Sequence, residues 1–467
     1  MRRIAGPDVQ ALRRLGGAVA FCVALMGTDA VAQTRTLTPE ALRAEASIAL
    51  QAGRPEIAAT YARALLARDA DDVDALILLS RAARTLGRLD EARDSASRAW
   101  ALADTPERRF AAAMVRAQAL ASSGQRTQAQ LWLRRAAEIA PSARLKAVAV
   151  RDFRYVRARN PWGTELSFSV APNSNINNGS RAETGTYEVP VFGTVDAALG
   201  GAAKALSGVE YTFGAQLRYR LQQSAVSRTD IAFGLSHRTY TLSEAAKEDA
   251  PDVEASDFAY SSVQGTLAHR GQLGDARRPY QISTTLGRTW YGGQPYMQYA
   301  VLGYRQTFVL GPGHRIDADI SRRWQETLGT RTSDAEIWDL GAAWSQRLGS
   351  GHALKLGVAL RDSTSDSANL DYRSTTLSAD LTLARPVLGA RIEMGLDLTV
   401  KHHDEGPVSG QDRTDHEAAA RITAILSDYD YYGFVPTLSL TARRTESDYG
   451  QYDVNEMGLN IGLRSAF

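Results

Sequence analysis

The stretch Val209–Gln222 reads VEYTFGAQLRYRLQ, and its apolar and polar side chains alternate with a period of two. A period of two places successive side chains on opposite faces of a β-strand. One face of this strand is aromatic and aliphatic, and the other carries Glu, Gln, Thr, Gly and Arg. A strand of this length with one apolar and one charged face is typical of a transmembrane β-barrel, apolar toward lipid and polar toward the lumen.

The same pattern continues from Trp162 to the end of the sequence. It predicts an all-β, antiparallel barrel over residues 160–467 with about fourteen strands, an even number as bacterial barrels require. Short turns alternate with longer polar loops such as Ser243–Ser256, Gln325–Asp334 and His403–Thr414. The predicted strands are 162–171, 208–222, 227–242, 257–271, 278–290, 297–311, 313–325, 335–349, 351–363, 370–386, 388–403, 414–428, 429–446 and 453–467.

Charged residues on the polar faces of these strands predict a wet lumen. A fourteen-stranded barrel is wide enough for a solute path, or for an extended chain if a plug moves. The segment 173–207 is open to two interpretations, an inward plug or an external loop. The candidate lumen-facing residues are Glu210, Arg218, Arg220, Arg391, Glu393 and Asp397.

The last strand carries a barrel-assembly signal. Leu459, Ile461 and Leu463 alternate on one face and Phe467 ends the chain. A terminal aromatic residue on an alternating strand is the feature by which outer-membrane assembly machinery selects its clients. The expected partners of this region are therefore that machinery and outer-membrane lipid.

Residues 38–155 have the helical period instead and repeat themselves. Gly53, Gly87 and Gly124 lie 34 and 37 residues apart, and each is followed five residues later by an alanine. A period near 34 is that of the tetratricopeptide repeat (TPR), whose helix pairs stack into a solenoid. An ordinary alanine-rich helical bundle is the alternative.

If the repeats form a solenoid, its first helices line a concave face. Such a groove suits an extended peptide or an acidic partner surface, although a solvated helical face explains the same pattern. Residues 33–160 hold 22 basic and 14 acidic side chains, whereas the rest of the mature chain is acidic. The candidate client-binding residues are Arg43, Ser47, Ile77, Arg81, Arg84, Met114 and Gln118.

Residues 1–32 are predicted to be a cleaved signal peptide. Arg13-Arg14 precede the apolar run Leu15–Met26, which is too short to span a bilayer. The small residues Ala30-Val31-Ala32 follow at the positions that signal peptidase requires. A twin-arginine signal is the alternative, and a lipidation site at Cys22 is a weaker one.

No element of the sequence nominates a catalytic residue, and a barrel enzyme with a nucleophile at a strand end is left as an alternative. G-x-S-x-G, H-E-x-x-H and phosphate-loop motifs are absent. The acidic and histidine-rich stretches His402–Glu405 and Asp415–Glu417 lie beside an expected loop without the spacing of a metal site. We therefore expect no catalytic residues, no metal and no cofactor, and nothing resembles a nucleic-acid module.

The barrel start resembles a known family. The segment 160–179 reads NPWGTELSFSVAPNSNINNG, with Pro161, Trp162, Asn173, Asn175 and Asn177 as its motif residues. Together with the Phe-terminated last strand, it resembles the surface lipoprotein assembly modifier (Slam) family. The resemblance implies periplasmic TPR helices before a fourteen-stranded barrel, and a translocon that brings lipoproteins or related proteins to the cell surface. The alternative is an outer-membrane channel, or a polysaccharide-export porin with a TPR docking domain, and the barrel enzyme is the third alternative.

Overall fold

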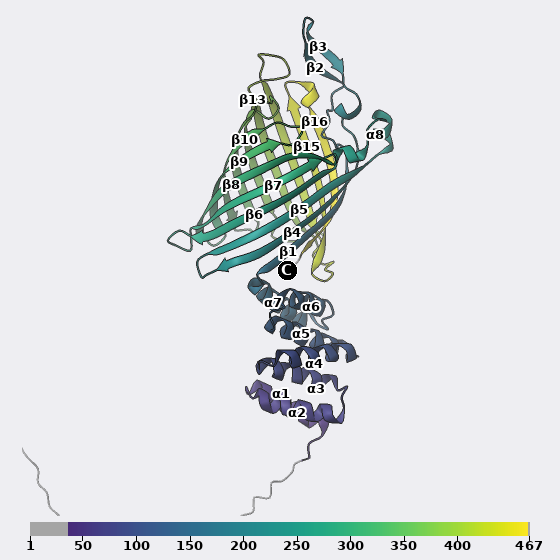
Figure 1. Cartoon of the computed structure of the whole chain (residues 1–467), viewed down its shortest axis with the longest axis vertical. Coiled ribbons are helices and arrows are strands. Elements are labelled where there is room, and N and C mark those ends of the chain that lie inside the picture. Colours follow the sequence, from purple (N-terminus) through teal and green to yellow (C-terminus); the bar gives the residue numbers. More distant parts are fainter. Residues whose placement is uncertain (1–35, 466–467) are drawn as a thin grey trace, which may run out of the picture.

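A computed structural model describes residues 36–465 and has two parts, a stack of helices and a barrel (Figure 1). The predicted signal peptide and Phe467 lie outside these residues. None of the described helices is long and apolar enough to cross a membrane. The stacked helices are α1 (Pro39–Gln51), α2 (Pro55–Arg68), α3 (Val73–Thr85), α4 (Leu89–Leu102), α5 (Pro106–Ser122), α6 (Arg126–Glu138) and α7 (Ala143–Arg159).

The same turn joins the helices of each successive pair. Gly53, Gly87 and Gly124 all have positive φ, at 69°, 76° and 82°. The residue after each glycine donates its N–H to a carbonyl five residues earlier, as Arg54 does to Ala49 at 2.8 Å. This arrangement is the Schellman ending, which a glycine in the left-handed region permits. The recurrence of one turn at three places is the structural form of the sequence repeat.

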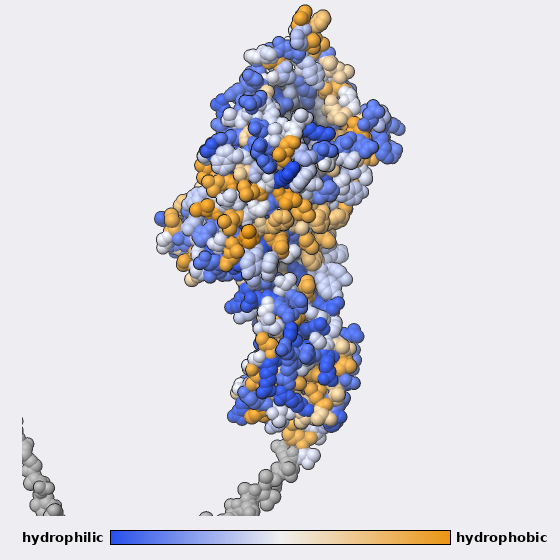
Figure 2. Space-filling model, viewed as in Figure 1, coloured by the Kyte–Doolittle hydropathy of each residue, from blue (hydrophilic) through white to orange (hydrophobic). Residues whose placement is uncertain are grey.

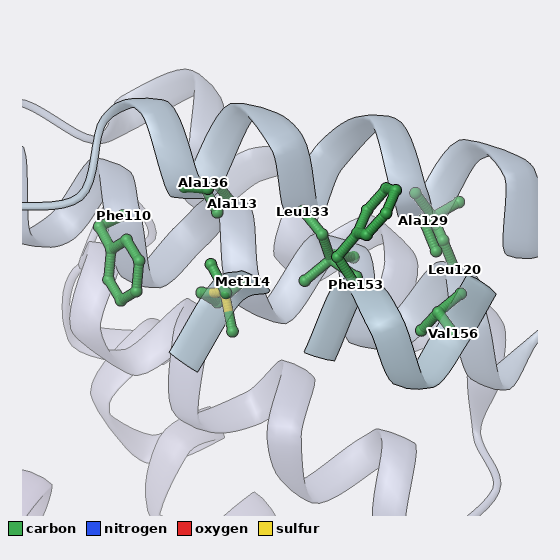
Figure 3. Packing of buried hydrophobic residues seen from close by; sticks show 12 residues of the cluster. Phe110, Ala113, Met114, Leu120, Ala129, Leu133, Ala136, Phe153 and Val156 are labelled. Carbon is green, nitrogen blue, oxygen red and sulfur yellow. The ribbon is translucent and has the colours of Figure 1, made fainter. Parts of the chain in front are cut away.

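Alanines and a few large side chains fill the contacts between helices. Ala58, Ala92 and Ala129, the alanines five residues after each turn glycine, are fully buried. Around α5, α6 and α7 the core also contains larger groups such as Leu133 and Phe153, which point toward one another in Figure 3. Small residues let neighbouring helices approach closely, and the larger ones fill the space that remains.

Replacing Leu133 tests this core. Leu133 is 1% exposed, so Leu133→Ala should lower the stability of the helices by about 2–5 kcal/mol. Leu131 lies on the same helix but is 62% exposed, and Leu131→Ala should change stability by less than about 0.5 kcal/mol. Urea titration of the helical circular dichroism of the full chain in detergent measures both. Equal effects of the two substitutions would contradict the packing described.

Within residues 36–465, fourteen strands close into one antiparallel barrel in which β1 pairs with both β4 and β16. The predicted fold class, a helical N-terminal part followed by a fourteen-stranded barrel, is confirmed. The barrel strands are β1 (Trp162–Asn173), β4 (Gly208–Gln223), β5 (Arg228–Leu242), β6 (Tyr260–Gln272), β7 (Pro279–Tyr291), β8 (Gln294–Gly311), β9 (His314–Thr327), β10 (Ala335–Arg347), β11 (Ala353–Thr364), β12 (Tyr372–Thr382), β13 (Arg391–His403), β14 (Arg413–Ile425), β15 (Phe434–Ser447) and β16 (Val454–Ser465).

The outer surface of the barrel is apolar around its middle (Figure 2). Leu166, Leu286 and Leu377 are more than half exposed on different strands, and many further aliphatic side chains accompany them. In water such a surface is unfavourable. In a bilayer it is the lipid-facing band of an outer-membrane barrel, whose closed sheet leaves no strand edge unpaired in the hydrocarbon.

The two ends of the barrel differ. At the end nearer the helices, which we call the helical end, short turns join the strands. The longest connections, residues 174–207 and 243–259, lie at the opposite, far end, where β7 and β8 are joined by Gly292-Gly293 alone. The segment between β1 and β4 lies outside the barrel at the far end, and contains the hairpin of β2 (Thr184–Val189) and β3 (Gly193–Ala198). Of the two interpretations of this segment, the external loop holds.

Candidate functional site

The face of the helices that the repeats predict as a groove contains an unneutralised pair of arginines. Arg81 and Arg84 lie one turn apart on α3, and neither forms an ion pair with another residue of 36–465. Arg81 is exposed to solvent, yet desolvation by the surrounding protein and the charge of Arg84 lower its pKa. The Nε of Arg84 is buried without a hydrogen-bond partner. Two adjacent like charges disfavour the helix until an anion binds them.

Two other predicted groove residues lie beside this pair in the repeat. Ser47 and Gln118 occupy the position of Arg81 in the preceding and following repeats, and both are partly exposed. We call these two residues, with Arg81 and Arg84, the arginine groove, after the concave face that the repeats predict for them. Its side chains are hydrogen-bond donors, with Ser47 and Gln118 also able to accept.

Three predicted groove residues have other roles in the structure. Ile77 and Met114 are each 6% exposed and pack into the hydrophobic cores between helices, so they do not present their side chains to a client. Arg43 donates to the Asp72 carboxylate at 2.7 and 3.1 Å, so its charge is neutralised within the fold. The prediction that Ile77, Met114 and Arg43 bind a client is therefore corrected. Counting from the turn glycines does not reveal which side chains the neighbouring helices cover when the repeats stack.

The Arg43–Asp72 pair stabilises the start of α3. Asp72 accepts from the Ala75 amide at 3.0 Å and so caps the helix. Burial raises the pKa of the Asp72 carboxyl, but the hydrogen bonds from Arg43 and Ala75 outweigh it and the pKa is lower than usual. Such a carboxylate stabilises the fold above its unfolded pKa, about 3.9, and loses that contribution as the pH falls through its folded pKa.

Asp72→Asn tests this linkage because asparagine keeps the cap and removes the charge. Between pH 6 and pH 3 the wild-type helices should lose more stability than those of the variant. Urea titrations of the full chain at both pH values give the difference. The same loss in both proteins would show that Asp72 does not contribute.

Helix α6 is bound to the helical end of the barrel. The Arg134 guanidinium donates to the carbonyls of Tyr432 and Gly433 at 2.8 and 3.1 Å, and to Ser465 Oγ at 2.9 Å. It also lies over the ring of Phe434, 4.5 Å from its centroid. These contacts reach the turn between β14 and β15 and the end of β16. We call them, with the two contacts described next, the latch.

Two further contacts complete the latch. The amide of Tyr432 donates to Glu138 at 2.9 Å, and Lys146 forms an ion pair with Asp430 at 2.8 Å. Between α7 and β1, Asn160 is buried and donates to Thr127 Oγ1, and its own Oδ1 accepts from the Trp162 amide. The helices are thus attached to the barrel through α6 and α7, next to the start of β1.

The lumen wall is polar and its charges are mostly paired. Glu210 lies 3.4 Å from Arg238, and Glu393 lies 2.6 Å from Arg391 and 3.3 Å from Arg464. On the neighbouring strands Arg218 and Arg220 approach Asp230 at 3.7 and 4.0 Å.

Alternation along the strands places these groups inside. Asp397 stands between Leu396 and Leu398, which are 45% and 47% exposed on the apolar outer face. The six candidate lumen residues all fall on the inner face by this alternation.

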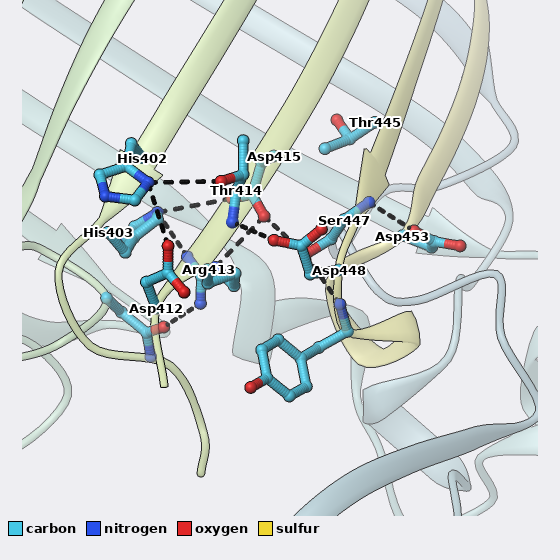
Figure 4. Close-up of polar contacts among 12 residues, drawn as sticks. His402, His403, Asp412, Arg413, Thr414, Asp415, Thr445, Ser447, Asp448 and Asp453 are labelled. Atoms are coloured by element: carbon cyan, nitrogen blue, oxygen red, sulfur yellow. Dashed lines mark hydrogen bonds and ion pairs between the residues drawn. The ribbon is translucent and has the colours of Figure 1, made fainter. Parts of the chain in front are cut away.

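Buried polar groups hold the loops at the far end. His403 is fully buried, and its Nε2 accepts from Arg413 at 2.6 Å because a guanidinium only donates. Its Nδ1 therefore donates to the Ala368 carbonyl at 2.9 Å. Arg413 and Asp415 continue the network toward Ser447, as Figure 4 shows. Both imidazole nitrogens are occupied, and residues 36–465 contain no cluster of His, Cys, Asp or Glu suited to a metal ion.

The asparagines at positions 173, 175 and 177 shape the loop after β1. Asn175 donates to the carbonyls of Gly179 and Asn455, and Asn177 donates to those of Ala202 and Lys204. Asn173 accepts from the Asn175 amide at 2.8 Å. These side-chain-to-backbone bonds fix loop conformation. Pro161 and Trp162 lie at the junction with α7.

No family model matches the sequence, and no curated protein matches it. Among solved structures, the helices are similar to the type III secretion translocator chaperone SycD of Yersinia enterocolitica, with 20% identity, covering 27% of this chain and 88% of that one, at a TM-score of 0.24. The barrel is similar to OccK7 of Pseudomonas aeruginosa (13% identity, 66% and 99% covered, TM-score 0.33) and to a BenF-like porin of Pseudomonas fluorescens (9%, 65% and 98%, 0.34).

Because these TM-scores are all below 0.5, we draw no conclusion about fold or function from the similarities. The assignment of the fold rests on the strand order and register of the barrel and on the repeated turns of the helices.

Proposed function

We propose that this chain is an outer-membrane translocon that brings lipoproteins or related proteins to the cell surface. The helices lie in the periplasm and recruit the client, and the barrel supplies the exit. The latch is the observation that carries the proposal, because it attaches the stack of helices that contains the arginine groove to the helical end of the barrel through α6 and α7. A merely tethered binding domain needs no such contacts.

The groove selects an acidic, extended segment of the client. Among residues 36–465, Arg81 and Arg84 have no carboxylate partner, and guanidinium groups bind carboxylates with two parallel hydrogen bonds. Gln118 and Ser47 provide further bonds to a peptide backbone. The basic charge of the helices as a whole favours encounter with such a segment.

The gene-level test is protease shaving of intact cells after deletion of the gene, with total protein as the control. Loss of one or more proteins from the surface, with their retention inside the cell, supports export. The charged lumen also suits an outer-membrane channel for small polar solutes, the second candidate. An unchanged surface with altered uptake of small solutes would favour that channel.

Reversing the groove charge tests recruitment. The double variant Arg81→Glu/Arg84→Glu should reduce surface display of the affected proteins about fivefold, from a loss of about 1 kcal/mol in client binding. Arg54→Glu/Arg88→Glu makes the same change of charge at two exposed turn positions outside the groove and should leave display unchanged. Equal effects of the two double variants would show that net charge, and not the groove, matters.

A further inference from the structure

One seam of the barrel is much shorter than the others. Among residues 36–465, β1 and β16 share three register pairs, Ser169–Gly462, Val170–Ile461 and Asn173–Gly458. By comparison, β12 and β13 share ten pairs, and β4 and β5 share fifteen. Ladder hydrogen bonds hold a barrel closed, and among the described residues the β1–β16 ladder has the fewest register pairs. Just beyond the end of β1, Ser174 and Met457 exchange two hydrogen bonds and Asn175 donates to the Asn455 carbonyl, so the far end of the seam is held by the loop that follows β1.

The sequence explains the weakness of this seam. The Ser174 amide donates across the seam to the Met457 carbonyl at 2.9 Å. In an antiparallel ladder the residue two positions earlier would also donate its N–H across the seam. That residue is Pro172, which has no N–H to donate. On the other strand, Gly458 and Gly462 lie in the interior of β16. Proline and interior glycine both weaken strand pairing and mark edge strands.

An apolar cleft of about 430 Å³ adjoins the far end of the seam. Side chains of β15 and β16 line one wall, including Leu440, Met457 and Leu459, and Pro172 and Val209 line the other. Met457 is 59% exposed on the lipid-facing surface. The cleft therefore opens toward lipid at the level where β1 ends.

The helices hold both strands of the seam. They continue covalently into β1 through Asn160-Pro161, and Arg134 donates to Ser465 at the end of β16. A movement of α6 relative to α7 would thus change the spacing between β1 and β16.

We infer that the barrel opens sideways between β1 and β16, and that the cleft receives the fatty acyl chain of a lipid-modified client as it passes into the membrane. The inference rests on the proposed function and names the lipid anchor as the part of the client for which the seam is built. An acyl chain passing between other strands meets ion pairs of the lumen wall such as Glu210–Arg238, and burying these against hydrocarbon is costly. The residues of the three β1–β16 register pairs carry no charge, and the ion pair Glu456–Arg443 lies at the far end of the seam.

A disulfide across the seam tests the inference. Ser169 and Gly462 are direct partners at a position without mutual hydrogen bonds, where Cα atoms are close enough for a disulfide. The control joins Thr423 and Ser439, which are partners of the same kind on β14 and β15. Cys22, the only native cysteine, lies in the predicted signal peptide.

Each pair is introduced into the full chain as S169C/G462C or T423C/S439C, oxidised in cells with copper–phenanthroline and reversed with dithiothreitol. The readout is the set of surface proteins that the gene-deletion strain lacks. Oxidation of S169C/G462C should reduce their display at least tenfold, reduction should restore it, and oxidation of T423C/S439C should have no effect.

Three results would contradict lateral opening or the proposed export function, and they distinguish between the two. Full display with the seam locked would overturn lateral opening and leave the proposed function standing. Loss of display with both disulfides would also overturn it, because the barrel as a whole and not this seam would need to move. If the gene deletion removes nothing from the surface, the proposed function itself fails, and the seam inference with it.

Discussion

Deleting residues 38–155 should leave a barrel that inserts into the outer membrane and displays almost no client. The fourteen strands hydrogen-bond to one another in a closed ring, so the sheet does not depend on the helices. Recruitment does depend on them, because Arg81 and Arg84 are removed together with the rest of the groove. Display measured by protease shaving should fall at least tenfold while the amount of barrel in the membrane fraction stays the same.

Unchanged display by the shortened chain would mean that the helices do not recruit the client. Loss of the barrel itself would instead show that the helices are needed for its assembly, and the separate measurement of membrane-inserted protein distinguishes the two results.

Arg134→Ala should release the helices from the barrel without unfolding either part. The guanidinium donates across the junction to two carbonyls and to the Ser465 hydroxyl, and bonds to a charged group contribute about 1.5–3 kcal/mol each. Their loss should raise hydrogen exchange at the turn Asp428–Gly433 and reduce display about tenfold. Arg144→Ala removes an exposed arginine from the neighbouring helix and serves as the control.

If Arg134→Ala increased exchange at that turn but left display unchanged, a fixed alignment of groove and lumen would not be needed for export. If it changed neither, the latch would contribute little to holding the two parts together.

The barrel could be predicted from the sequence because contact with lipid constrains every strand in the same way. Each strand must present apolar side chains outward, so a period of two is visible along the whole C-terminal part, as in Val209–Gln222. The glycines at 53, 87 and 124 are equally visible, since their backbone conformation admits few other residues.

The details of the candidate site are less visible because they depend on contacts between distant parts of the chain. Arg134 and Tyr432 are 298 residues apart, and no local pattern relates them. Ile77 and Met114 have the right spacing for a groove, but the next repeat covers them. The sequence does not predict the partners of His403, because Ala368 and Arg413 approach it only in the closed barrel.

In-cell photocrosslinking tests the route of the client most directly. A photoreactive amino acid is placed in the full chain at Gln118 in the groove, at Asp397 in the lumen, or at Leu398, which faces lipid beside it. A protein that the gene deletion removes from the surface should crosslink at Gln118 and at Asp397, and not at Leu398. Crosslinks of that protein at Gln118 and Leu398 with none at Asp397, or at none of the three positions, would contradict passage from the helices into the barrel.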